Sequence, residues 1–148
     1  MEINYVSGGM EIIDAIEELW NMQCDYHEEK SLYFKDKFKN LTFEYRKNAM
    51  MRDDKDVNII IAQDGHMSIG YVISTIKNGT GELFSLYLKP HYRGLNIGEK
   101  LMEASLTWME NSGAEKIELG VAVGNEVVLD FYRKFDFYPY VIMMERKK

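Results

Sequence analysis

The segment with the clearest chemistry covers residues 92–98 and reads YRGLNIG. It lies between a strand-like run that stops at Pro90 and a helical pattern that begins near Ile97. A turn of this kind directs backbone N–H groups and the positive end of a helix dipole into one small space. Glycines let a phosphate approach the backbone, and Arg93 can add a charge-assisted hydrogen bond. The segment therefore indicates an anion site, although an ordinary tight strand-to-helix turn explains the spacing equally well.

Other phosphate-binding loops do not fit this turn. A P-loop ends in Gly-Lys-Ser/Thr, and a dinucleotide fold opens its first helix with G-x-G-x-x-G, and the chain has neither pattern. Nucleoside triphosphates and NAD are therefore disfavoured as ligands.

Two motifs together resemble the GNAT acetyltransferase superfamily. Residues 86–98, LYLKPHYRGLNIG, look like its acetyl-CoA signature, a strand and a proline followed by R/Q-x-x-G-x-G/A at a helix start. Asn125 and residues 131–137, FYRKFDF, resemble the family's Asn and its F-Y-x-x-x-G-F segment. Asn96 and Asp136 stand where the family has glycine. Both residue types are common in turns, and Asn tolerates unusual backbone angles, so we expect little structural cost.

The resemblance implies where acetyl-CoA would bind as a co-substrate. Backbone groups of Leu86 and Leu88 would hold the pantetheine arm as an added pseudo-strand, and N–H groups from Leu95 to Glu99 would hold the pyrophosphate. Asn125 would reach the pantetheine, or would serve only as a helix N-cap. The cofactor-binding candidates are Leu86, Leu88, Arg93, Gly94, Leu95, Asn96, Ile97, Gly98, Glu99 and Asn125.

The same resemblance supplies two catalytic candidates. Tyr132 would protonate the coenzyme thiolate, although it also fits a packed core position beside Phe131 and Phe135. Glu82, at the start of a strand, matches a base used by some family members, but a solvated carboxylate explains it as well. Many members of the superfamily use a chain of water molecules in place of a single catalytic base. His27 ends an apolar helix stripe and fits a packed histidine better than a catalytic one.

The acceptor of the acetyl group would be a small-molecule amine or a protein amine. In this superfamily the acceptor pocket usually draws on the first two helices, here residues 24–38. Aromatic and acidic side chains there could hold a cationic amine, or could simply pack and be solvated. These side chains are Tyr26, His27, Glu28, Glu29, Tyr33 and Phe34. The alternative function is a non-catalytic acyl-CoA-binding or interaction domain on the same fold, and a ligand-free structural domain would require both motifs to be coincidental.

Composition narrows the class of protein. The chain has 148 residues, 46% of them hydrophobic and 28% charged, which predicts one folded domain over residues 1–148. A net charge of -6 disfavours nucleic-acid binding and weakly favours a cationic substrate. No apolar run is long enough to span a bilayer, and residues 1–5 do not resemble a signal peptide, so we expect a cytoplasmic protein without membrane contact. Cys24 is expected to be a reduced core residue, no metal site is visible, and a homodimer is left open.

Periodicity predicts the elements that would position these residues. Strands are expected at 3–6, 57–62, 66–76, 82–88, 116–123 and 137–144, with hairpin turns at Asp64-Gly65 and Asn78-Gly79. A first helix is expected at 11–27, and a second carries Phe34, Phe38, Leu41 and Tyr45 on one face. Further helices are expected at 97–111 and after Asn125. The order β-α-α-β-β-β-α-β-α-β predicts an α/β (mixed α+β) fold, GNAT-like, in which about four helices flank a mixed, mostly antiparallel sheet.

Overall fold

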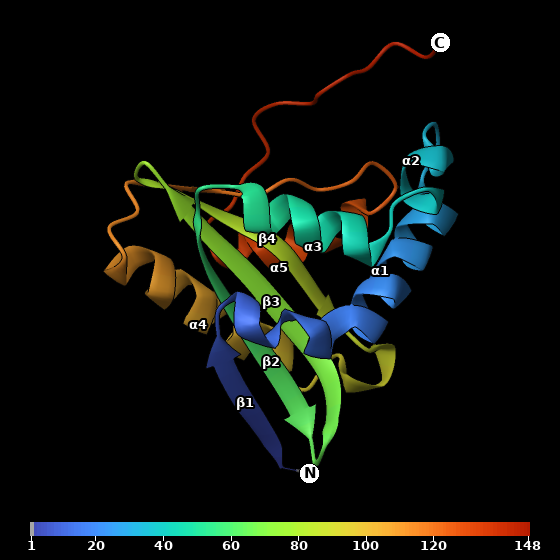
Figure 1. Cartoon of the computed structure of the whole chain (residues 1–148). Coiled ribbons are helices and arrows are strands. Elements are labelled where there is room, and N and C mark those ends of the chain that lie inside the picture. Colours follow the sequence, from blue (N-terminus) through green and yellow to red (C-terminus); the bar gives the residue numbers. More distant parts are fainter. Residues whose placement is uncertain (1) are drawn as a thin grey trace.

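A five-stranded sheet with the strand order β1-β2-β3-β4-β5 organises the molecule (Figure 1). The computed structural model describes residues 2–148. The first four strands pair in antiparallel fashion, whereas β5 pairs with β4 in parallel. The strands are β1 (Ile3–Gly8), β2 (Asp56–Asp64), β3 (Met67–Lys77), β4 (Thr80–Leu88) and β5 (Lys116–Glu118).

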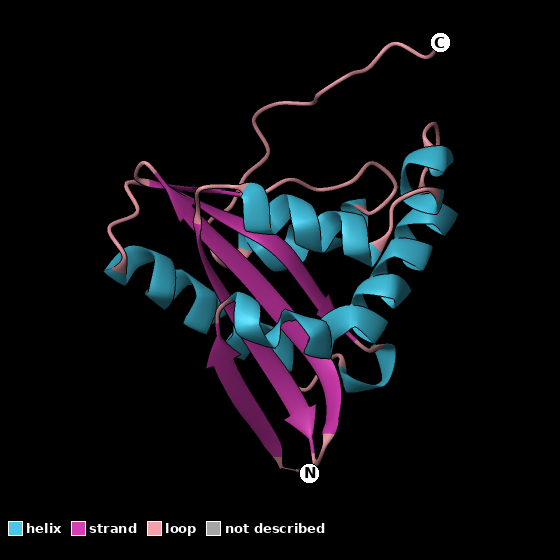
Figure 2. Cartoon of the chain, in the orientation of Figure 1, coloured by secondary structure: helices cyan, strands magenta, loops and turns pink. Residues whose placement is uncertain are grey.

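Helices cover both faces of this sheet (Figure 2). One face carries the 3-10 helix η1 (Met10–Ile16) with α1 (Glu17–Lys30), α2 (Lys35–Lys39) and α3 (Phe43–Arg52). The other face carries α4 (Ile97–Asn111) and α5 (Leu129–Arg133), and short 3-10 turns η2 (Pro90–Tyr92) and η3 (Glu126–Val128) precede them.

The buried run in β2 shows why the sheet is covered twice. Ile59 and Ile61 belong to the core that faces α1 and α3, whereas Ile60 and Ala62 belong to the core that faces α4. Successive strand residues point to opposite faces, so an unbroken apolar run needs an apolar partner on each side. The helices on both faces supply those partners.

The two predicted hairpins are present. Gly65 has a φ of 62°, and Asn78 and Gly79 have φ of 51° and 78°. Residues that tolerate positive φ match the twist of tight hairpin turns. The β2–β3 and β3–β4 pairings therefore follow from local turn chemistry.

Strand β4 departs from regular pairing at two places that shape the site. Ser74 of β3 pairs with Leu83, but Ile73 pairs with Ser85, so Phe84 is an extra residue in a β-bulge. On its other edge β4 pairs with β5 only from Thr80 to Glu82. A bulge bends a strand, and the loss of a neighbour exposes its backbone groups. Beyond Glu82 the sheet opens on this side.

Several predicted boundaries were wrong. The first helix begins as the 3-10 segment η1, and the second predicted helix is two helices, α2 and α3, because Thr42 interrupts it and caps α3 by accepting from the N–H of Tyr45 at 3.1 Å. Strand β5 ends at Glu118, five residues before the predicted limit. The predicted strand at 137–144 is not formed: Phe137 is half-buried, and residues 138–144 are exposed and lie outside the sheet. Pro139 lacks an N–H donor, and the shortened β5 offers that segment no adjacent ladder.

Gly124 provides a test of the contact between the segment before η3 and the end of α1. Its φ is 105°, and a Cβ there would lie 2.1 Å from the backbone oxygen of Lys30 at the end of α1. Gly124→Ala should therefore lower the free energy of unfolding by about 3 kcal/mol, combining left-handed strain and overpacking.

Gly113→Ala is the matched control for that substitution. Its φ of 88° carries similar strain, but no atom lies within 4 Å of the added Cβ, so a loss of about 1 kcal/mol is expected. Urea unfolding measures both variants. Equal losses would show that the contact with Lys30 does not constrain the loop.

Candidate active site

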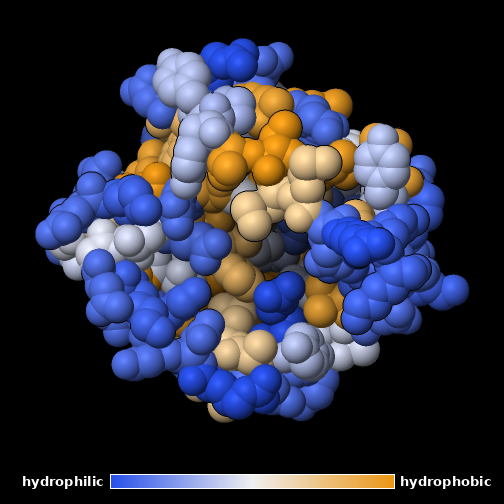
Figure 3. All heavy atoms as spheres, turned by 90° about the horizontal axis from the view of Figure 1, so that it is seen from above, coloured by the Kyte–Doolittle hydropathy of each residue, from blue (hydrophilic) through white to orange (hydrophobic). Residues whose placement is uncertain are grey.

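A cleft opens where β4 loses its neighbour β5, and it contains two adjoining cavities. The turn cavity, about 310 Å³, lies beside the segment that leads into α4. The helix cavity, about 250 Å³, lies between β4, α1, α3 and the segment 120–122. Figure 3 shows hydrophobic residues around a hollow, with hydrophilic residues farther out. Both cavities share the lining residues Gln23, His27, Leu86, Asn125, Val128 and Tyr132.

The turn before α4 has the backbone geometry of an anion site. Asn96 takes left-handed angles, φ 67° and ψ 12°, and α4 starts at the next residue. Lys100 is the first to donate back to Asn96, at 3.2 Å. The N–H groups of residues 97–99 thus stand at the open, positive end of a fifteen-residue helix. Gly98 and Glu99 of this end line the turn cavity.

Both departures from the family's glycines fall at positions with left-handed backbone. Asn96 has a φ of 67° and Asp136 a φ of 65°. Asn and Asp adopt this region more readily than other non-glycine residues. These backbone angles are consistent with the expected small structural cost, which stays a prediction.

The free edge of β4 presents backbone groups to the cleft. The Leu86 carbonyl accepts from Nε2 of Gln23 at 3.0 Å, and the Leu88 carbonyl accepts from Nε of Arg93 at 3.0 Å. In an antiparallel pair the N–H and C=O of one residue point to the same side. The N–H groups of Leu86 and Leu88 therefore also face away from β3, toward the turn cavity.

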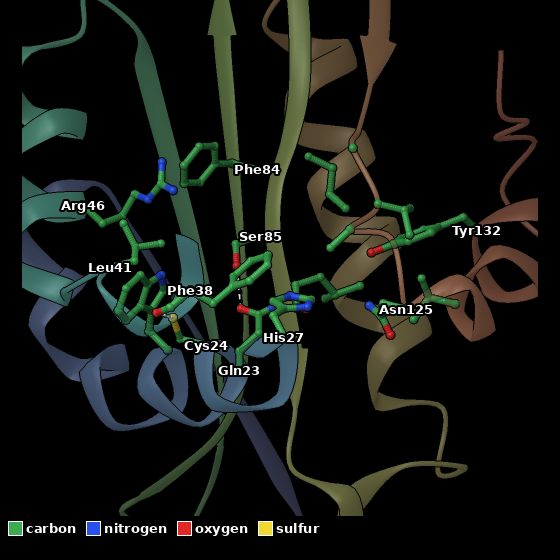
Figure 4. Close-up of a pocket in the computed structure, with 17 residues that line it drawn as sticks. Gln23, Cys24, His27, Phe38, Leu41, Arg46, Phe84, Ser85, Asn125 and Tyr132 are labelled. Atoms are coloured by element: carbon green, nitrogen blue, oxygen red, sulfur yellow. Dashed lines mark hydrogen bonds between the residues drawn. The ribbon is translucent and has the colours of Figure 1, made fainter. Parts of the chain in front are cut away.

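Gln23 is a site residue that the sequence reasoning missed. Besides its bond to Leu86, its Oε1 accepts from the Tyr71 hydroxyl at 2.5 Å and from the Ser85 hydroxyl at 2.9 Å. These bonds tie α1 to β3 and β4, and Figure 4 shows Gln23 beside Ser85 of β4. A polar residue three positions after Trp20 and four before His27, on the stripe that packs on the sheet, was the available signal.

Tyr132 lies where the two cavities meet. Its ring packs edge-on against Phe131 and Phe137, at centroid distances of 5.5 and 6.3 Å. Its hydroxyl points into the cleft (Figure 4). Burial raises the pKa of Tyr132 to about 12. The phenol therefore holds its proton at neutral pH and is available as a donor.

Comparison with known proteins decides the family. The model of the acetyltransferase (GNAT) family matches residues 14–137. The chain belongs to this family. N-alpha-acetyltransferase 30 of Schizosaccharomyces pombe is 38% identical over 85 residues, 54% of this chain and 57% of that protein. Mycothiol acetyltransferase of Corynebacterium glutamicum is 31% identical over 86 residues, 56% of this chain and 29% of that protein. The chain therefore spans a little more than half of the length of the first relative and less than a third of the length of the second.

Solved GNAT structures share the fold. PaiA N-acetyltransferase of Thermoplasma acidophilum, crystallised in complex with coenzyme A, superposes with a TM-score of 0.73 at 23% identity, covering 91% of this chain and 89% of that one. The predicted fold class, a mixed and mostly antiparallel GNAT-like sheet with flanking helices, is confirmed.

The GNAT motif residues do not all reach the cleft in the same way. Side chains or backbone of Leu86, Leu88, Arg93, Gly94, Gly98 and Glu99 line the turn cavity. Leu95 is 48% exposed, and the side chain of Ile97 is buried in the core beneath the turn. The guanidinium of Arg93 lies 5.7 Å from the ring of Tyr87 and bonds Leu88, so it is anchored to β4.

Asn125 does not cap the following helix through its side chain. Instead its Oδ1 accepts a hydrogen bond from the Tyr26 hydroxyl at 3.1 Å, and Asn125 lines both cavities. The bond joins α1 to the segment across the cleft. Asn125 thus occupies the N-cap position of η3, but its side chain bonds Tyr26 and not the helix.

Glu82 lies outside the cleft. It lines neither cavity, and its carboxylate is 3.9 Å from Nζ of Lys55. The short β5 still covers β4 at this residue, because Glu82 pairs with Glu118. This placement matches the solvated strand-end carboxylate rather than a base.

His27 is a titratable side chain that lines both cavities. It packs against Phe38 at 5.4 Å and Tyr26 at 5.9 Å, and its Nδ1 is buried without a hydrogen-bond partner among the described residues. Burial lowers the pKa of His27. The imidazole is therefore neutral at neutral pH and can accept a proton.

The acceptor segment at 24–38 contributes fewer side chains than expected. Glu28, Glu29, Tyr33 and Phe34 line neither cavity, and Tyr26 lines only the turn cavity. Cys24 lines the helix cavity and donates to the Phe38 carbonyl at 3.2 Å, and burial raises the pKa of its thiol. The aromatic and acidic set proposed for a cationic amine does not assemble at the cleft.

Two broader features complete the description. Across residues 2–148, no cluster of His, Cys, Asp and Glu side chains is arranged to hold a metal ion. None of the helices in that range combines the length and apolarity needed to span a membrane.

Proposed function

We propose that this chain is an acetyl-CoA-dependent N-acetyltransferase that acts as one domain over residues 1–148. One observation carries the proposal: Tyr132 and His27 both line the junction of the two cavities. A thioester held in the turn cavity and an amine held in the helix cavity would meet at this junction. Family membership and the open turn before α4 support the same assignment.

Acetyl-CoA fits the turn cavity through backbone groups. The N–H groups at the start of α4, with Gly94 and Gly98, would hold the pyrophosphate. The edge of β4 at Leu86 and Leu88 would pair with the pantetheine amides, and Asn125 would close the opposite side. An N–H near Leu88 would polarise the thioester carbonyl.

Transfer of the acetyl group requires two proton movements. The acceptor ammonium must lose a proton before its nitrogen forms the C–N bond, and the sulfur must gain one as the C–S bond breaks. His27 is the neutral group positioned to accept the first proton. Tyr132 is the protonated group positioned to supply the second.

The raised pKa of Tyr132 restricts how it acts. With a pKa of about 12, its proton is about 3 pKa units less acidic than that of a free thiol. A complete transfer to sulfur is therefore uphill unless a proton released by the nitrogen returns to the phenolate. Tyr132 would first stabilise the developing thiolate by hydrogen bonding and would then relay the nitrogen's proton.

A non-catalytic acyl-CoA-binding domain is the alternative. Asn96 and Asp136 would favour it if they marked a decayed site. Since both residues hold the left-handed angles that the turns require, they give that alternative no support. Both a small-molecule amine and a protein amine remain proposals for the acceptor, and a homodimer remains a prediction.

Gly98→Glu tests the coenzyme site. A Cβ at Gly98 would lie 3.6 Å from the Phe131 ring, an ordinary contact, so the fold should survive. A carboxylate there would meet the pyrophosphate. We therefore expect the dissociation constant for acetyl-CoA, measured by calorimetry, to increase at least tenfold. Ser112→Glu adds the same charge at the other end of α4 and should leave affinity unchanged. Full affinity in Gly98→Glu would place the phosphates elsewhere.

Tyr132→Phe tests the acid. The substitution keeps the ring and its packing on Phe131 and Phe137, so a loss of rate reports the hydroxyl. Removal of a general acid costs about 100-fold to 10,000-fold in rate. We expect kcat to fall at least tenfold with little change in the KM for acetyl-CoA, measured by thiol release. A kcat within a factor of two of the parent would return Tyr132 to a packing role.

His27→Gln tests the base through the pH dependence of kcat/KM. Because burial lowers the pKa of His27, the neutral base persists below pH 6.5, and activity should fall only at still lower pH. The variant should lose at least tenfold in kcat/KM and should lack this acidic limb. His66→Gln, on an exposed turn, is the control. An unchanged acidic limb in His27→Gln would assign it to another group.

A further inference from the structure

Charge is distributed unevenly between the protein surface and the helix cavity. The whole chain carries a net charge of -6, yet none of the described residues that line this cavity is Asp or Glu. Arg46 is the one lining side chain that is charged at every physiological pH. The acceptor side of the cleft therefore has a local charge opposite to that of the molecule.

Arg46 is a partly buried cation without an ion-pair partner among the described residues. It is half-buried on α3, with its guanidinium 5.2 Å from the centre of the Phe84 ring. Within residues 2–148 no carboxylate lies within ion-pair distance of it, whereas its neighbour Lys47 bonds Asp14 at 2.7 Å. A guanidinium stacked on a ring keeps its planar fork free for a bidentate anion.

The position of Arg46 also defines an orientation. Figure 4 shows Arg46 and Phe84 on one side of the cavity and Tyr132 on the opposite side. Apolar side chains of Phe38, Leu41 and Phe84 line the space on the Arg46 side (Figure 4), and Trp20 also lines this cavity. A ligand with an anion at one end would bind Arg46, rest its apolar part on these walls and direct its other end toward His27 and Tyr132.

We propose that the acceptor is an amine that also carries a carboxylate, with an apolar body between the two groups. This inference rests on the proposed function and names its substrate class. Polyamines and other polycations are disfavoured, because they would place positive charge beside an unpaired guanidinium with no acidic side chain to compensate. A free amino acid with its amine and carboxylate at opposite ends, and a peptide with an acidic residue near its N-terminus, share the required chemistry.

The test compares acceptors that differ only in the carboxylate. The acceptors 6-aminohexanoate and 4-(aminomethyl)benzoate are each paired with their carboxamides. A tetrapeptide with glutamate at its second position is paired with its glutamine version, and spermidine represents the polycations. Thiol release from acetyl-CoA gives kcat/KM for each. We expect at least one carboxylate to exceed its amide about tenfold or more, which is typical of a charge-assisted bidentate contact. The peptide pair separates a protein source from a free amino acid.

Arg46→Gln should abolish this preference while leaving the KM for acetyl-CoA unchanged, and Arg46→Lys should restore part of it. Arg52→Gln is the matched control, because Arg52 lies exposed on the same helix and lines neither cavity. A preference that persists in Arg46→Gln, or faster turnover of spermidine or of the amides, would overturn the proposal.

Binding separates failure of this inference from failure of the proposed function. If no amine is turned over, calorimetric titration of 6-aminohexanoate and 6-aminohexanamide into the parent protein and Arg46→Gln still measures the anion site. If only the parent binds the carboxylate preferentially, the anion site at Arg46 is supported and the proposed acetyl transfer is rejected. Equal binding of the two ligands would reject the anion site itself.

Discussion

The short parallel pairing of β5 is the constraint on which the site depends. Only Thr80, Gly81 and Glu82 of β4 have a partner on that edge. Every later backbone group on the same edge must find another partner, since an unpaired buried N–H or C=O is costly. Gln23 and Arg93 bond two of the carbonyls, and the remaining groups face the turn cavity. The cleft forms because β5 ends early and no other strand pairs with the rest of the β4 edge.

The two-sided core determines which elements reach the cleft. The helix α1 packs on one face and brings Gln23 and His27 to the opening, while α5 packs on the other face and brings Tyr132. Each side chain is held by a separate apolar core, so the junction has rigid support from two directions. Acid and base candidates therefore belong to different layers of the molecule and approach each other only at the free edge.

Prediction from the sequence was accurate where the signal was local. Asp64-Gly65 and Asn78-Gly79 determine hairpins by their own backbone preferences, and the stripe of α4 determines a helix and its preceding turn. The end of β5 and the loss of the strand at 137–144 depend on pairing with distant residues, which periodicity does not encode. Gln23 and Arg46 were missed for the same reason: each acquires its role only after α1 and α3 are placed beside β4. Glu82 was named by its position along the strand, but the edge that β5 covers determined its surroundings.

The hydrogen bond between Tyr26 and Asn125 has a consequence for the order in which the molecule forms. The two residues are 99 positions apart, and the close approach of Gly124 to Lys30 closes the same long loop. Contacts of such separation bear a large loop-closure entropy and form after local hairpins and helices. During synthesis, α1 and the first four strands are made before residue 125. The β4 edge therefore stays open until the later segment is added, and the cleft is completed only when that segment packs against α1.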